Sequence, residues 1–295
     1  MIDPKLLDKI RTGTGFIAAL DQSGGSTPGA LKAYGVGADA FSNDEEMYGL
    51  IHNMRTRIIT SPAFTGGKVL AAILFERTMD GEADGQPVPQ ALLGRGVLPF
   101  LKVDKGLEDA ADGVKMMKLM PDLNALLARG KATGVVGTKM RSVIDEADLV
   151  GIAAIVAQQF VVANRIIDAN LMPIIEPEVS IGSSTRAAAE DILLAELTKA
   201  LDAQSEGREV MLKLTIPTVA NLYAPLVDHP RVARVVALSG GFTRDEACAE
   251  LAKNRGMIAS FSRALLSDLR ADMSDEQFDA TLDTAIDQIC TASAG

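Results

Sequence analysis

Short apolar runs alternate with longer amphipathic stretches along almost the whole chain. Each run has the length of a β-strand, and most of them stop at a proline or a charged residue, which is typical of buried parallel strands. We predict strands over residues 15–20, 69–75, 97–103, 133–139, 172–175, 210–217, 232–238 and 256–261. We predict helices over residues 44–59, 123–128, 147–169, 185–201, 262–269 and 274–292.

Eight strands that alternate with amphipathic, largely helical stretches predict an α/β fold of the (β/α)8 or TIM-barrel type. The main alternative is a doubly wound open sheet, which normally carries a G-x-G-x-x-G turn after its first strand. The corresponding turn here, Gln22–Pro28, does not have that spacing. Because no change of composition marks a linker, we expect one barrel domain over residues 1–295, ending in two helices.

The sixth predicted strand, within Val210–Pro217, carries Lys213 at its centre. An ammonium group is costly to bury unless it is paired. Burial favours the neutral amine, which is a nucleophile for ketones and aldehydes. A structural lysine that reaches the surface or pairs with an acid is the alternative interpretation. The positions of the other charged residues bear on this choice.

Charged residues lie at or near the carboxyl ends of six predicted strands, where barrels carry their chemistry. Because each buried charge needs a partner, packing alone does not explain so many of them at one mouth. Residues two apart on a strand also share a face. The residues are Asp21, Lys102, Lys139, Arg141, Glu176, Glu178, Lys213 and, just beyond the eighth strand, Arg263.

The chemistry of these groups suggests individual roles. Lys213 is the candidate nucleophile that forms an imine with a ketone. Lys139 is a second cation whose charge favours the neutral form of the first amine. Glu176 is the candidate for moving protons during carbinolamine dehydration, with a raised pKa if it is partly buried. Asp21 is positioned to orient and neutralise the protonated imine.

Two segments are candidates for binding phosphate. Ser239, Gly240 and Gly241 follow the seventh strand, and Arg263 follows the eighth. Backbone N–H groups of small residues can face an anion, and barrels commonly bind phosphate at these two places. An ordinary strand-to-helix turn explains the Ser-Gly-Gly segment equally well.

The composition of the chain indicates which partners and which cellular compartment to expect. A net charge of −10 argues against nucleic acid as a partner. Cys248 and Cys290 show no pairing pattern, which fits a reducing compartment. The start of the chain lacks a secretory signal, and the longest apolar run, 149–157, is too short for a bilayer. We therefore expect a cytoplasmic protein without membrane contacts, and the sequence is compatible with a homo-oligomer.

We expect no metal and no other cofactor. A zinc-dependent enzyme of this kind needs several imidazole ligands at strand ends. The chain has only two histidines, and we expect both to be solvated. His52 lies in a predicted exposed helix and His229 in a loop before Pro230.

Seven segments closely resemble the class I fructose-bisphosphate aldolase family, in its shorter bacterial branch. The resemblance extends from about Thr14 to Arg270 and keeps the family's order of motifs. The segments are Ala19–Pro28, Phe100–Gly106, Gly137–Arg141, Ile174–Val179, Met211–Pro217, Leu238–Gly241 and Phe261–Leu265.

The resemblance implies the barrel fold and the reversible, metal-independent cleavage of fructose 1,6-bisphosphate to dihydroxyacetone phosphate and glyceraldehyde 3-phosphate, in glycolysis or gluconeogenesis. It implies Lys213 as the imine-forming residue and Glu176 as the main proton-transfer residue. Asp21, Lys139 and Glu178 are their implied catalytic partners. The implied substrate and phosphate contacts are Ser26, Lys102, Arg141, Ser239, Gly240, Gly241 and Arg263.

Two positions depart from the family pattern. Gly29 stands where this branch often has a lysine, so one phosphate contact is expected to be weaker or supplied by Lys32. The segment Thr291–Gly295 lacks the longer tyrosine-ended tail of animal members, so another group is expected to fill any role of that tail in enamine protonation. The alternative functions are a lysine-imine aldolase or transaldolase for another phosphorylated sugar, and a non-catalytic barrel that binds sugar phosphates.

Overall fold

The computed structural model describes residues 2–295, in which eight parallel strands close into a barrel. The strands neighbour one another in the order β5-β2-β1-β11-β10-β9-β8-β7, and pairing of β5 with β7 closes the ring. They are β1 (Phe16–Leu20), β2 (Val69–Leu74), β5 (Leu98–Lys102), β7 (Gly137–Ile144), β8 (Met172–Val179), β9 (Val210–Thr215), β10 (Val232–Leu238) and β11 (Met257–Phe261). The predicted barrel is confirmed.

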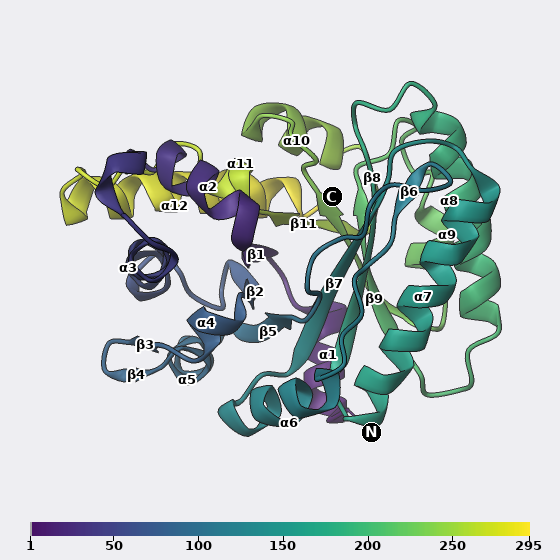
Figure 1. The fold of residues 1–295 in the computed structure, drawn as a ribbon, viewed down its shortest axis with the longest axis horizontal. Helices are drawn as coiled ribbons and strands as arrows, with labels where there is room; N and C mark the ends of the chain where they lie inside the picture. Colours follow the sequence, from purple (N-terminus) through teal and green to yellow (C-terminus); the bar gives the residue numbers. More distant parts are fainter. Residues whose placement is uncertain (1) are drawn as a thin grey trace.

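Helices surround the barrel. The outer helices are α3 (Asp44–Thr60), α5 (Val88–Gly94), α6 (Leu123–Thr133), α7 (Leu149–Asp168), α8 (Arg186–Asp202), α9 (Ala224–Val227), α10 (Arg244–Leu251) and α12 (Asp275–Ala292). Of these, α7, α8 and α9 lie on one side of the barrel, and α3 and α12 lie on the opposite side (Figure 1). The remaining α-helices and strands are α1 (Pro4–Thr12), α2 (Thr27–Ala33), α4 (Glu76–Met79), α11 (Arg263–Leu266), the hairpin of β3 (Glu82–Ala83) and β4 (Gln86–Pro87), and β6 (Val114–Lys115), which pairs antiparallel with β7. Two 3-10 helices lie at Gly24–Ser26 and Ala38–Ala40.

The inward positions of the strands change from apolar to charged along the barrel axis. A buried apolar cluster inside the barrel includes Ala19, Phe100, Ile174 and Met211, and Ile10 of α1 also belongs to it. Alternate residues of a strand face the same side. Two residues beyond the members of this cluster, and beyond Gly137 of β7, the inward positions are Asp21, Lys102, Glu176, Lys213 and Lys139.

Several predicted boundaries differ from the structure. Residues 133–136 were predicted as strand, but α6 continues to Thr133 and ends at Gly134, whose φ of 103° suits glycine. β7 therefore begins at Gly137 and runs on to Ile144. The helices α1, α2, α4, α5, α9 and α10 were not predicted, because helices of four to nine residues leave little periodic pattern in a sequence.

Helix α7 is long and apolar enough by length and composition to cross a membrane. In the barrel, half of that stretch is buried, and the helix packs along β7, β8 and α8. Its high apolar content is therefore explained by its place between the strands and a neighbouring helix.

Candidate active site

A cavity of about 850 Å³ opens at the carboxyl ends of the strands. Its walls come from strands far apart in the sequence, because the closed barrel brings their ends together. Among the charged groups of the lining, six side chains are basic and three are acidic, in a protein whose net charge is −10. The predicted site residues that line it are Asp21, Ser26, Lys102, Lys139, Arg141, Glu176, Lys213 and Arg263.

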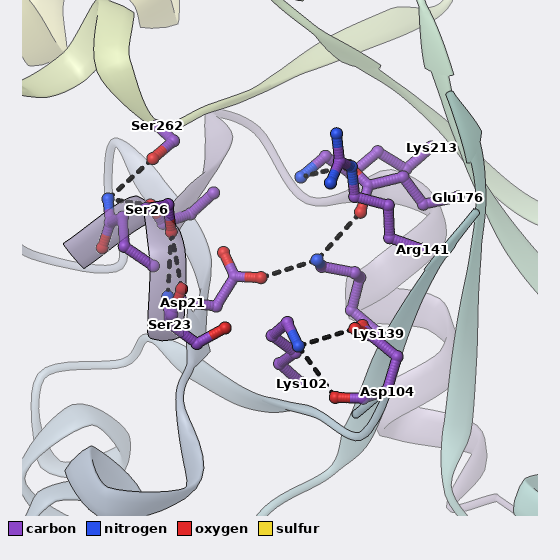
Figure 2. A network of polar contacts seen from close by, with 12 residues as sticks. Asp21, Ser23, Ser26, Lys102, Asp104, Lys139, Arg141, Glu176, Lys213 and Ser262 are labelled. Atoms are coloured by element: carbon purple, nitrogen blue, oxygen red, sulfur yellow. Dashed lines mark hydrogen bonds and ion pairs between the residues drawn. The ribbon is translucent and has the colours of Figure 1, made fainter. Parts of the chain in front are cut away.

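Four buried side chains form a continuous chain of alternating charge across the cavity (Figure 2). The Lys213 Nζ lies 3.0 Å from Glu176 Oε1, and the Lys139 Nζ lies 2.9 Å from Glu176 Oε2. The Lys139 Nζ also lies 2.6 Å from Asp21 Oδ2. Each of the four is at most 9% exposed. The carboxylate of Glu176 therefore bridges the two lysines.

This pairing corrects one expectation about the site. Burial by itself raises the pKa of Glu176, but the ammonium groups of Lys139 and Lys213 outweigh it and hold the pKa below its usual value. The expected raised pKa of Glu176 was wrong, because the sequence did not reveal that two lysines contact this carboxylate. The same contact gives Lys213 an acidic partner.

Asp21 and Lys139 stabilise each other's charged forms. Burial alone raises the pKa of Asp21, but Lys139 and Lys213 hold it far below its usual value. Burial alone lowers the pKa of Lys139, but Asp21 and Glu176 hold it well above its usual value. Both groups therefore remain charged throughout the neutral pH range.

Acidification is expected to weaken the fold through Asp21. The pKa of Asp21 is lower in the folded than in the unfolded protein. Its contribution to the free energy of unfolding is therefore complete above the unfolded pKa of 3.8 and is lost as the pH falls through the folded pKa. The loss is about 1.4 kcal/mol for each pH unit below the unfolded value. Urea unfolding at pH 7 and pH 3 should therefore show a smaller drop in unfolding free energy for Asp21→Asn than for the unsubstituted protein. Equal drops would contradict the assignment.

Two further ion pairs flank the central chain. The Lys102 Nζ donates to the Asp104 backbone oxygen at 2.8 Å and to its carboxylate at 2.6 Å. The Arg141 Nε donates to Glu178 Oε2 at 2.5 Å. Glu178 is thus a partner of Arg141, and it is absent from the residues that line the cavity. These pairs hold two cations at the cavity wall.

The predicted phosphate segments lie beside each other. A Cβ atom built on Gly241 would lie 3.5 Å from Arg263 Nη2, so the guanidinium passes close to the Ser239–Gly241 turn. Gly240 and Gly241 have φ values of 61° and 129°, which favour glycine. Within residues 2–295 their backbone N–H groups donate to no other group. The turn lies next to Arg263, outside the set of residues that line the cavity.

The first turn after β1 lies at one wall of the cavity. Ser23 and Ser26 form a reciprocal pair, with the Ser23 N–H donating to Ser26 Oγ at 3.0 Å. Gly29 lines the cavity, whereas Lys32 is exposed and does not. The structure therefore does not bring Lys32 to the wall where it was expected to replace the missing lysine.

Three site residues were not identified in the sequence. Gln22 and Ser262 line the cavity and contact each other, and the buried Arg55 of α3 contacts Gln22. Arg55 left a signal, since it lies between Ile51 and Ile59 on the buried face of its helix. Gln22 and Ser262 lie within two of the segments that resemble the family, Ala19–Pro28 and Phe261–Leu265, but their uncharged side chains did not mark them as site residues.

The two histidines were expected to be solvated, but each has a polar contact with another residue. Neither of them lines the cavity. His52 Nε2 lies 3.1 Å from the Glu82 backbone oxygen, and His229 Nε2 lies 3.2 Å from Asp202 Oδ1. In the described part of the chain, no three His, Cys, Asp or Glu side chains are grouped so that they could hold a metal ion.

Comparisons with known proteins bear on the family and the fold of this chain. The family model described as fructose-bisphosphate aldolase class-I matches residues 8–219, which include the central charged residues of the site. A fructose-bisphosphate aldolase from Plasmodium falciparum, solved with TRAP and a small-molecule inhibitor, has a similar fold, with a TM-score of 0.79 and 20% sequence identity over 99% of this chain and 96% of that chain. Cgl0159 from Corynebacterium glutamicum has a TM-score of 0.57 and 14% identity over 99% and 98% of the two chains. These two structures support the barrel fold.

Proposed function

Because this chain belongs to the class-I fructose-bisphosphate aldolase family, we propose that it reversibly cleaves fructose 1,6-bisphosphate through an imine on Lys213. The products are dihydroxyacetone phosphate and glyceraldehyde 3-phosphate. We further propose that it acts in the cytoplasm, in glycolysis or gluconeogenesis, without a metal or another cofactor.

The observation that carries the proposal is the bridge formed by Glu176 between Lys213 and Lys139. Imine formation needs a neutral amine, and the contacting carboxylate can accept the proton that Lys213 must lose. As that proton moves to Glu176, the ion pair between Lys139 and Asp21 stays charged and holds these two side chains in place.

Each step of the proposed reaction moves a defined proton or electron pair. The Lys213 amine attacks the ketone carbon, and loss of water from the carbinolamine gives a protonated imine, with Glu176 supplying the proton to the leaving hydroxyl. Glu176, which is a carboxylate again after that step, takes the C4 hydroxyl proton as the aldehyde leaves, and this proton is the one later returned to the enamine carbon. The electron pair of the C3–C4 bond moves into the imine and gives a neutral enamine, which costs less than an enolate. The enamine is then protonated at carbon, and hydrolysis releases the ketone phosphate and restores the amine.

The cavity suits an elongated substrate with an anion at each end. Lys102 and Arg141 lie on β5 and β7, whereas Arg263 follows β11. Two anchored phosphates would hold the open-chain sugar across the mouth, so that binding energy aligns the scissile bond with Lys213.

Two assays test the proposed function together. The purified protein should cleave fructose 1,6-bisphosphate in the presence of EDTA, and borohydride with dihydroxyacetone phosphate should add one adduct per chain. Cleavage of another phosphorylated sugar in its place would identify a different lysine-imine aldolase. Loss of activity in EDTA that zinc restores, or no adduct with any ketone, would overturn the imine mechanism.

Arg263→Ala is expected to weaken substrate binding strongly. A charge-assisted contact to phosphate contributes roughly 1.5–3 kcal/mol, which corresponds to at least a tenfold rise in KM. Steady-state kinetics with fructose 1,6-bisphosphate measure this change in KM. A change in KM below about twofold would show that Arg263 does not bind phosphate.

A further inference from the structure

A chain of side-chain hydrogen bonds links the buried Arg55 of α3 to the cavity. Arg55 is 1% exposed, and its two terminal nitrogens donate to Thr78 Oγ1 at 2.7 Å, to the Gln22 backbone oxygen and to Gln22 Oε1 at 3.1 Å. Gln22 Nε2 in turn donates to Ser262 Oγ at 2.7 Å. The chain therefore connects the turn after β1 with the end of β11, which are 240 residues apart.

The direction of each bond in this chain follows from its donor. Arginine has only donors, so the amide oxygen of Gln22 faces Arg55 and its nitrogen faces Ser262. A second contact requires the same orientation, because Gln22 Nε2 also lies 3.4 Å from the backbone oxygen of Ala19, which only accepts. Ser262 Oγ is consequently an acceptor toward Gln22.

This leaves the hydrogen of the Ser262 hydroxyl free. A hydroxyl has one hydrogen and two lone pairs, and one lone pair accepts from Gln22. Within residues 2–295, Ser262 Oγ donates to no other group, and the residue lines the cavity next to Arg263. The hydroxyl is therefore a donor available to a ligand in the cavity.

We infer that Ser262 is a phosphate-binding residue whose hydroxyl donates to the same substrate phosphate as Arg263, and that Gln22, held by Arg55, sets the direction of that bond. The inference rests on the proposed function for the identity of the substrate. The fixed amide turns the serine lone pair toward Gln22, so the hydroxyl meets an anion without first reorganising. Gln22 and Arg55 act as positioning residues and need not touch the substrate.

The test compares the unsubstituted protein with Ser262→Ala in binding dihydroxyacetone phosphate and unphosphorylated dihydroxyacetone. Saturation of the borohydride adduct measures the apparent dissociation constant of each ketone. Loss of a hydrogen bond to a charged group should raise the value for dihydroxyacetone phosphate about tenfold and leave that for dihydroxyacetone unchanged. Ser267→Ala is the matched control, because Ser267 lines the same cavity and accepts a bond from Arg244 rather than from Gln22. We expect it to change neither constant by more than twofold.

Inorganic phosphate, titrated by calorimetry, separates this inference from the proposed function. Phosphate binding needs no imine, so Ser262→Ala should weaken it about tenfold even if Lys213 forms no adduct with any ketone. An unchanged phosphate affinity in Ser262→Ala, or an equal loss for both ketones, would overturn the role of Ser262.

A double-mutant cycle tests the role of Gln22. Gln22→Met removes the bond to Ser262 and should weaken dihydroxyacetone phosphate binding about threefold, because the hydroxyl is then free to turn away. In the Ser262→Ala background the same substitution should have no effect, since there is no hydroxyl to orient. Equal effects in both backgrounds would show that Gln22 does not act through Ser262.

Discussion

Lys213→Met is expected to abolish both the borohydride adduct and the cleavage of fructose 1,6-bisphosphate. A methionine fills the same space but has no amine, so the covalent route is lost, and kcat should fall on the order of 10⁴-fold or more. The measurements are steady-state kinetics and mass spectrometry of the peptide that contains residue 213. Circular dichroism should show an intact fold.

Lys102 and Lys139 are the rival amines at the cavity wall. Lys102 pairs with Asp104, and Lys139 pairs with both Asp21 and Glu176. Among residues 2–295, Lys213 forms an ion pair with Glu176 alone. A single proton transfer to Glu176 therefore frees Lys213. An adduct on the peptide of either rival in the unsubstituted protein would reject Lys213 as the imine-forming residue.

Glu176→Gln is expected to lower kcat roughly 10²- to 10⁴-fold, because an amide cannot carry protons between the amine and the carbinolamine. The substitution keeps the size of the side chain and an oxygen that accepts a hydrogen bond, but removes the carboxylate that can take the proton of Lys213. Stopped-flow trapping with borohydride should show slower imine formation. Since the lost group acts on the chemical steps, KM should change much less than kcat.

Glu178→Gln is the matched control for this substitution. The two carboxylates lie two residues apart on β8, but Glu178 contacts Arg141, and only Glu176 contacts the lysines. We expect Glu178→Gln to act through the position of Arg141, and therefore mainly on KM. If both variants lost kcat to the same extent, the proton-transfer role would not belong to Glu176 alone.

The sequence alone determined the barrel and the face on which the chemistry lies. Apolar runs of strand length predicted the eight strands, and the charged residues at or near their carboxyl ends predicted the mouth of the barrel as the site. These features are local, because burial and alternation act on each strand separately. The motifs that indicated the family lie at the same strand ends.

Only the tertiary structure decided which charges meet and in which direction the hydrogen bonds run. Glu176 bridges Lys213 and Lys139 because β7, β8 and β9 are neighbours in the closed sheet, and this contact reversed the expected pKa shift of Glu176. The contact of Gln22 with Ser262 likewise exists because β1 pairs with β11. A residue's electrostatic environment is the sum of contacts from elements distant in the chain, and no local pattern contains that sum.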